Sequence, residues 1–178
     1  MARKPVTESL LANNKDYVQD MALMVSDCAK LHKGQEYAEL AVFLGYLRAL
    51  TIVHQSHHWQ TAGQNFYSDH ILFERLYNET NGEVDTIAEK TVGVGNVALT
   101  NYFIQMHHVV KFLESVAKGE AITTESLRAE MMLVIAGEII LETLKQRGNL
   151  SSGVEQAIGN VLDLHEGHLY LLQNREDR

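Results

Sequence analysis

The chain has 178 residues, and its 46% hydrophobic and 21% charged content is typical of one compact folded domain and argues against disorder. No apolar run reaches the roughly 18 residues that a membrane span needs, and the N-terminus lacks the hydrophobic core of a signal peptide. The sequence therefore predicts a soluble protein, with a formal net charge of -8. Its single cysteine, Cys28, excludes an internal disulfide and agrees with a reducing compartment, so we expect a cytoplasmic location.

Hydrophobic periodicity and glycine breaks predict an all-α fold. We expect residues 1–33 to form an N-terminal extension, either an amphipathic helix or a mobile arm, and residues 34–178 to form a four-helix bundle. The connection between the second and third bundle helices has helical periodicity over residues 101–118 and predicts a short crossing helix. The other predicted helices span residues 7–31, 35–62, 65–92, 123–147 and 151–174.

Five side chains of the kind that bind metals lie between residues 58 and 89. They are His58, His70, Glu74, Asp85 and Glu89. On the predicted helix 65–92, the last four are two i,i+4 pairs that face one broad stripe. At 1.5 Å rise per residue, His70 and Asp85 are roughly 22 Å apart along the axis, so one folded chain cannot bring them to one ion.

A symmetric dimer would bring these separated side chains to one site. Glu74 and Asp85 have the same sequence midpoint as His70 and Glu89, between Glu79 and Thr80. An antiparallel copy of the helix, related by a two-fold axis there, would place Glu74 opposite the mate's Asp85 and His70 opposite the mate's Glu89. His58, at the end of the preceding helix, is free to approach the His70 end. The pattern predicts two equivalent metal sites per dimer.

Imidazole and carboxylate ligands without thiolates suit ferrous iron, manganese or zinc. Carboxylates also tolerate the change from Fe(II) to Fe(III). We therefore expect iron, with zinc or manganese as substitutes. The alternative is that these acidic residues form a solvated helix face, as they commonly do.

The same residues carry a family resemblance. His58-Trp59-Gln60-Thr61-Ala62-Gly63-Gln64-Asn65-Phe66, followed by His70, Glu74 and Asp85-Thr86-Ile87-Ala88-Glu89-Lys90, resembles the signature of the Dps mini-ferritins, the DNA-protection-during-starvation family. The resemblance covers about residues 35–173. It implies a ferritin-like four-helix bundle assembled into a hollow shell of twelve subunits.

The resemblance also implies an activity. Ferroxidase centres at the two-fold interfaces would oxidise Fe(II) with hydrogen peroxide or oxygen, and ferric mineral stored in the shell would protect against oxidative stress. Carried over, it makes His58, His70 and Glu74 one half of the catalytic metal site, and Asp85 and Glu89 of the neighbour the other half. Two departures stand out: Glu74 replaces a more familiar Asp, and the loop 147–153 lacks the acidic residues often found near iron-entry pores.

Other functions compete with this interpretation. DNA binding, suggested by the family name, would rest on Arg3 and Lys4, but the net charge disfavours direct contact with phosphate. An ordinary ferritin or other diiron enzyme would carry Glu-x-x-His on two bundle helices. No glutamate in the chain has a histidine three residues later, which counts against a site inside the bundle. A shell with a decayed, silent site is a further alternative.

The remaining histidines are predicted to be mainly structural. His54 lies one turn before His58 and could guide iron, but a structural or surface role is the simpler interpretation. The pairs His107-His108 and His165 with His168 have ligand-like spacing without an evident set of carboxylates, so surface or hydrogen-bonded roles are expected. Trp59 is next to the predicted ligand His58 in sequence. It could pack at an interface, or it could take up an oxidising equivalent formed during iron oxidation. Cys28 is expected to be a small core residue.

Overall fold

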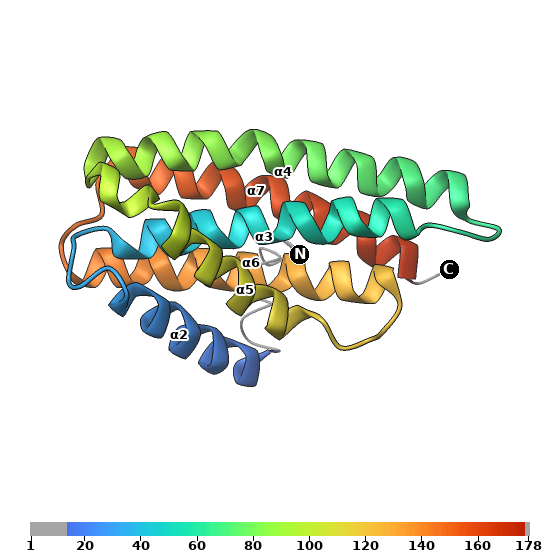
Figure 1. The fold of residues 1–178 in the computed structure, drawn as a ribbon, viewed down its shortest axis with the longest axis horizontal. Coiled ribbons are helices and arrows are strands. Elements are labelled where there is room, and N and C mark those ends of the chain that lie inside the picture. Colours follow the sequence, from blue (N-terminus) through green and yellow to red (C-terminus); the bar gives the residue numbers. More distant parts are fainter. Residues whose placement is uncertain (1–13, 177–178) are drawn as a thin grey trace, which may run out of the picture.

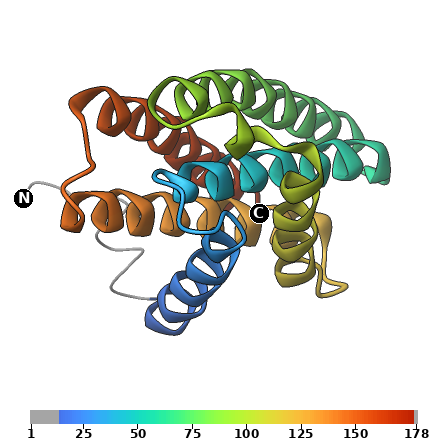
Figure 2. The same ribbon diagram turned by 60° about the vertical axis from the view of Figure 1, so that its left-hand side comes forward.

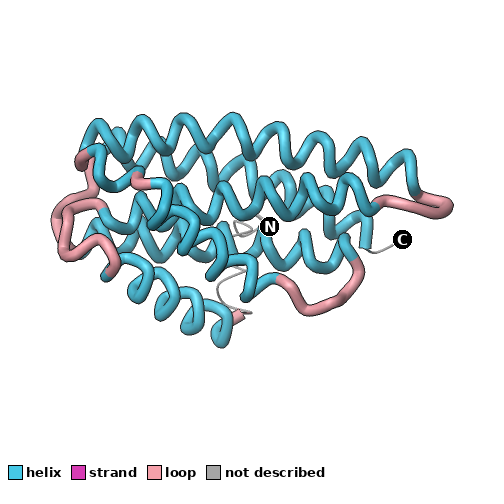
Figure 3. The backbone as a smooth tube through the Cα atoms, in the orientation of Figure 1, coloured by secondary structure: helices cyan, strands magenta, loops and turns pink. Residues whose placement is uncertain are grey.

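The computed structural model describes residues 14–176 of the chain, and within this range it contains α-helices, one short 3-10 helix and no strand (Figures 1 and 3). The elements are α2 (Lys15–Lys30), α3 (Ala38–Gln60), α4 (Phe66–Val94), η1 (Val97–Thr100), α5 (Tyr102–Val116), α6 (Ile122–Gln146) and α7 (Ser152–Glu176). The predicted all-α fold is confirmed. The predicted start of the first helix, residues 7–13, lies outside the described residues.

Four long helices form the bundle. In both ribbon views α3, α4, α6 and α7 run alongside one another, with α3 against α4 and α6, and α7 against α4 and α6 (Figures 1 and 2). Helix α5 connects the second and third of these helices and crosses the outside of α3, as predicted. Helix α2 packs on α3 and α6, so residues before the bundle cover part of its surface.

The core is built around α3, which is buried along most of its length because α2, α4, α5 and α6 all pack against it. Phe43, Leu47 and Leu50 are fully buried there. Helix α5 approaches most closely at Gly45, where an added Cβ would lie 2.4 Å from Cβ of His108. Cys28 is buried at the α2 face of this core, as expected for a small core residue.

Glycine marks the corners of the bundle. Gly63 (φ 79°) lies between α3 and α4, and Gly148 (φ 72°) lies between α6 and α7. This left-handed conformation costs other residues more than it costs glycine. Between residues 14 and 176 no helix combines the length and the apolar character needed to cross a membrane.

Candidate metal centres

Helix α4 is unbroken over 29 residues from Phe66 to Val94. This confirms the single long helix on which the interfacial site is predicted. Because His70 and Asp85 are fifteen residues apart on it, their separation along the axis is roughly 22 Å. One chain therefore holds the predicted ligands as two separate groups, one towards each end of α4.

The group at the start of α4 brings His58 and His70 together. Their rings stack with centroids 3.7 Å apart. Nδ1 of His58 lies 3.0 Å from the backbone carbonyl of His70, and Nδ1 of His70 lies 3.2 Å from the backbone carbonyl of His58. A carbonyl only accepts, so both Nδ1 atoms carry the proton and donate it. In the neutral ring this tautomer leaves the lone pair on Nε2, which is the arrangement that a metal-binding histidine needs.

Thr61 supports this histidine pair. Its hydroxyl donates to the carbonyl of His58 at 2.9 Å, and its oxygen lies 3.3 Å from Nδ1 of His70. Thr61 follows the end of α3 directly, so the corner between α3 and α4 fixes both rings. Glu74, one turn after His70, is partly exposed.

The second group, Asp85 and Glu89, is exposed on the surface of α4. Both carboxylates are therefore open to a partner. Large apolar side chains are also exposed on neighbouring elements, and such surface commonly marks an interaction site. We call these residues the apolar surface; they are Ile52 and Trp59 on α3, Phe66, Tyr67 and Ile71 on α4, and Tyr102, Phe103, Met106 and Val110 on α5.

A different set of ligand-type side chains meets inside the bundle. Glu130 of α6 is completely buried and faces three imidazoles. Its Oε1 lies 2.8 Å from Nε2 of His54 and 2.9 Å from Nδ1 of His168, and its Oε2 lies 2.6 Å from Nδ1 of His165. One ligand atom each from Glu130, His165 and His168 falls within 4.8 Å of the others, the single such group found among the described residues.

Two further carboxylates lie behind the histidines of α7. Nε2 of His165 is 2.9 Å from Glu83, and Nε2 of His168 is 2.8 Å from Glu79, both on α4. Nδ1 of His54 lies 3.2 Å from the hydroxyl of Ser126. We call Glu130, His54, His165, His168, Glu79 and Glu83 the core cluster; all four bundle helices contribute to it.

Charge is concentrated in the core cluster. Burial alone would raise the pKa of the Glu130 carboxyl, but the charge of His165 and hydrogen bonds from the histidines hold it well below its usual range. Burial opposes a charge on His165 as well, yet Glu130 and Glu83 raise its pKa to about 9. Burial lowers the pKa of His54 despite its hydrogen bond to Glu130. Near neutral pH, Glu130 is ionised, His165 is protonated and His54 is neutral.

The surroundings of His165 and His168 differ from the expectation drawn from the sequence. The expected lack of carboxylates around them is wrong, because three glutamates surround the two rings. The expectation of hydrogen-bonded roles is confirmed for both. His54 is likewise buried and hydrogen-bonded to Glu130, in agreement with the structural role expected for it.

His107 and His108 have different surroundings in the structure. His107 is exposed, whereas His108 is buried with its Nε2 2.9 Å from Nε2 of His32 on the α2 side of the core. No sequence pattern indicates that His32 is the partner of His108. Nδ1 of both rings is buried without a hydrogen-bond partner. Trp59 is 70% exposed, so it is not packed within its own chain.

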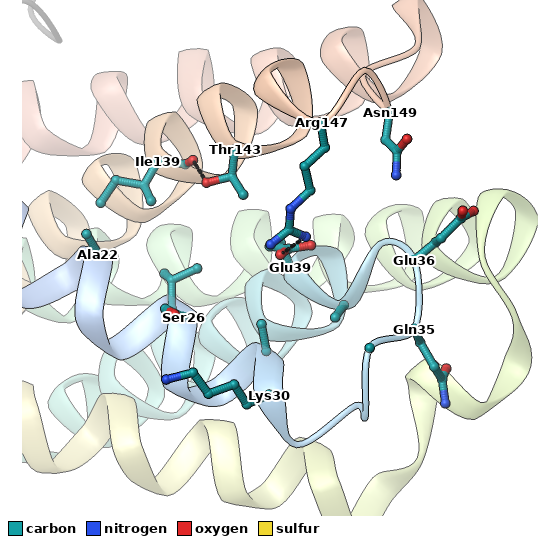
Figure 4. A pocket seen from close by; sticks show the side chains of 14 residues that line it. Ala22, Ser26, Lys30, Gln35, Glu36, Glu39, Ile139, Thr143, Arg147 and Asn149 are labelled. Atoms are coloured by element: carbon teal, nitrogen blue, oxygen red, sulfur yellow. Dashed lines mark hydrogen bonds and ion pairs between the residues drawn. The ribbon is translucent and has the colours of Figure 1, made fainter.

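A hollow of about 700 Å³ lies between α2, α3 and α6, away from both groups of ligands (Figure 4). Arg147, from the loop that lacks acidic residues, reaches into it and pairs with the buried Glu39 at 2.5 Å. No histidine lines this hollow. Its polar groups are therefore a poor match for ferrous iron, manganese or zinc.

Known proteins resemble this chain in sequence. It is 28% identical over 123 residues to the DNA protection during starvation protein of Brevibacillus brevis, a match covering 65% of this chain and 77% of the relative. It is 33% identical over 97 residues to the nutrient stress-induced DNA-binding protein of Nostoc sp. (strain PCC 7120), covering 54% of this chain and 50% of the relative. No family model matches the chain.

Solved structures resemble it in fold. A Dps from Thermosynechococcus elongatus aligns with a TM-score of 0.61 and 15% identity, over 88% of this chain and 90% of the other. The Dps of Vibrio cholerae O1, described as a member of a broad superfamily of ferritin-like diiron-carboxylate proteins, gives the same TM-score and identity over 86% and 91%. These comparisons confirm the resemblance to Dps proteins and the ferritin-like fold.

Proposed function

Because the chain has the fold of Dps proteins and resembles them in sequence, we propose that it is a mini-ferritin of the Dps type. Two copies would unite across a two-fold axis at the middle of α4, and twelve would form a hollow shell. Ferrous iron is the substrate, oxidised where two subunits meet and stored inside as ferric mineral. The main observation in support of this proposal is the His58–His70 pair, in which each Nδ1–H donates to the backbone carbonyl of the other residue.

Each interfacial metal site would take its ligands from two chains. His58, His70 and Glu74 of one subunit would offer two imidazole nitrogens and a carboxylate, and Asp85 and Glu89 of its partner would add two carboxylates. Neutral imidazoles favour Fe(II), while carboxylates balance the extra charge of Fe(III). Two ferrous ions give two electrons to one hydrogen peroxide, which takes up two protons and leaves as two waters. With oxygen as the oxidant, the same ligands serve.

The apolar surface supports a second copy of the chain as the partner. Its members on α3 and α4 border the His58–His70 pair in sequence, and α4 and α5 both pack on α3. Association would bury this surface and bring the exposed Asp85 and Glu89 of one chain to the other. Burial of apolar area of this kind is the main driving force for stable association.

The first test is anaerobic loading with ferrous iron, followed by stoichiometric hydrogen peroxide. Ferric absorbance and particle size are measured for the wild type and for Asp85→Ala/Glu89→Ala. We expect rapid oxidation in a shell-sized particle, slowed at least tenfold by the double substitution. Glu155→Ala/Asp163→Ala, which removes the same charge from exposed positions on α7, is the matched control. Equal rates in all three proteins would contradict the proposal.

Mixed assemblies test whether the site is shared. In a dimer of one His58→Ala subunit and one Glu89→Ala subunit, one of the two metal sites carries both substitutions and the other carries neither. We therefore expect co-assembled particles to regain activity that each variant lacks by itself. If particles of confirmed mixed composition stay inactive, the ligands act within one chain and the shared site is wrong.

DNA binding is a second candidate, favoured by the names of the relatives from Brevibacillus brevis and Nostoc sp.. The net charge of -8 counts against it, and Arg3 and Lys4, its predicted contacts, lie outside the described residues. Gel-shift titration at two salt concentrations, with Arg3→Ala/Lys4→Ala as the comparison, tests it. Binding that is weakened by this substitution and by salt would establish direct contact with phosphate.

A further inference from the structure

The core cluster has the features of a metal site, separate from the interfacial one. We propose that it binds one divalent transition-metal ion inside each subunit, through Glu130, His165 and His168. All three side chains are at most 1% exposed. Their ligand atoms lie within 4.8 Å of one another, and the ligands of a tetrahedral ion are roughly 3.4 Å apart at metal–ligand distances near 2.1 Å. Small side-chain movements suffice to admit the ion.

The orientation of the imidazoles points to the same position. Nδ1 of His165 and of His168 both face Glu130, at 2.6 and 2.9 Å. These two residues are one helical turn apart on α7, so a single face of that helix presents both nitrogens. An ion between them and the Glu130 carboxylate would replace the protons that now lie in these hydrogen bonds.

The surroundings are those of a metal-binding histidine pair. A coordinating imidazole almost always donates its other N–H to a carboxylate, a carbonyl or water. In the core cluster, Nε2 of His165 faces Glu83 and Nε2 of His168 faces Glu79. Both rings are thus held by a carboxylate at Nε2, with Nδ1 directed towards Glu130, where an ion would replace its proton. Nε2 of His54, on α3, lies 2.8 Å from Oε1 of Glu130 and helps to hold the carboxylate in place.

The charges favour a divalent cation. The core cluster contains three carboxylates, Glu130, Glu79 and Glu83, which all lie within hydrogen-bond distance of its histidines. A doubly charged ion beside them would offset negative charge that is costly to bury without a partner.

Two carboxylates on α4 lie between solvent and the site. The Glu79 and Glu83 side chains retain 33% and 16% of their exposure, although the histidines behind them are buried. Carboxylates that reach from solvent to a buried imidazole can pass a cation inward. The ligand set differs from the paired Glu-x-x-His helices of ferritin-like diiron proteins, because His-x-x-His on α7 meets a single glutamate on α6. Imidazole with carboxylate suits Fe(II), Zn(II), Mn(II) and the spectroscopic probe Co(II).

Cobalt titration of His58→Ala/His70→Ala/Asp85→Ala/Glu89→Ala, which removes both imidazoles and the partner's carboxylates from the interfacial site, tests the proposal. We expect this variant to bind one Co(II) per chain with visible absorption. Adding Glu130→Gln should weaken binding at least tenfold, whereas adding His107→Gln, an exposed histidine outside the cluster, should not. Failure of the fourfold variant to bind Co(II), or an equal affinity once Glu130→Gln is added, would overturn the proposal.

X-ray absorption of the cobalt-loaded His58→Ala/His70→Ala/Asp85→Ala/Glu89→Ala protein provides a second measurement that needs no change in the core. We expect scattering from at least two imidazoles. A shell of oxygen atoms alone would overturn the proposal, even if Glu130→Gln fails to fold. Iron oxidation by the wild type does not enter either test, so the interfacial ferroxidase and the core site succeed or fail separately.

Discussion

Burial and the nearest carboxylate decide how each histidine titrates. Six of the nine histidines are buried: His32, His54, His57, His108, His165 and His168. Glu130 and Glu83 raise the pKa of His165 to about 9, whereas burial and the neighbouring His32 and His107 lower the pKa of His108 to about 4. The same side chain therefore serves as a buried cation in one place and as a neutral group in another.

The His32–His108 pair predicts sensitivity to acid. The folded-state pKa of His108 lies below the 6.5 of an unfolded chain, so the unfolded state binds the proton more tightly. Stability is complete above pH 6.5 and falls as the pH drops from there towards 4, by up to about 3 kcal/mol for this group. Urea unfolding between pH 7 and 4 measures the loss. His108→Phe should reduce this pH dependence strongly, whereas His107→Gln removes only the weakest of the three effects on the His108 pKa and should change it little. Similar slopes in both variants would exclude the pair as the cause.

At the level of elements, Gly45 sets the distance between α3 and α5. A Cβ at this position would lie 2.4 Å from Cβ of His108, and both belong to stiff helices. Gly45→Ala should destabilise the protein by about 1–2 kcal/mol, because the overpacking outweighs the gain in helix propensity. Gly159 lies within α7 with open space at its Cβ position, so Gly159→Ala should stabilise the protein by up to about 1 kcal/mol. We expect the midpoint of thermal unfolding to fall for Gly45→Ala and to rise for Gly159→Ala.

Much of this architecture could be predicted because its signals are local. Glycines at 63 and 148 mark helix ends, and the spacing of His70, Glu74, Asp85 and Glu89 is regular on one helix. The core cluster could not be found in this way, since its members come from four helices and form no Glu-x-x-His motif. Two signals remained: the His165-x-x-His168 spacing, and Glu130 at the head of the apolar run 131–136. Their meeting depends on how α6 and α7 align, which no local pattern specifies.

At the level of the whole molecule, the apolar surface gives a prediction about assembly. Phe103 and Met106 are 79% and 53% exposed on α5. If a second copy covers them, Phe103→Lys/Met106→Lys should leave monomers with unchanged helix content and abolish iron oxidation, because neither half of the site is complete alone. Light scattering and circular dichroism measure assembly and helix content. Leu23→Lys, at an exposed apolar position on α2, is the control, and intact shells from the α5 variant would contradict this interface.

The position of Glu130 has a consequence for how the bundle chooses its alignment. Apolar side chains tolerate a helix that slides by one turn, since one leucine replaces another with little change in contact. A buried carboxylate does not, because a shifted α3 or α7 would withdraw its donors and leave a charge without a partner. Glu79 and Glu83 extend the same constraint to α4. The core cluster thus destabilises every packing of the four helices in which its side chains do not meet.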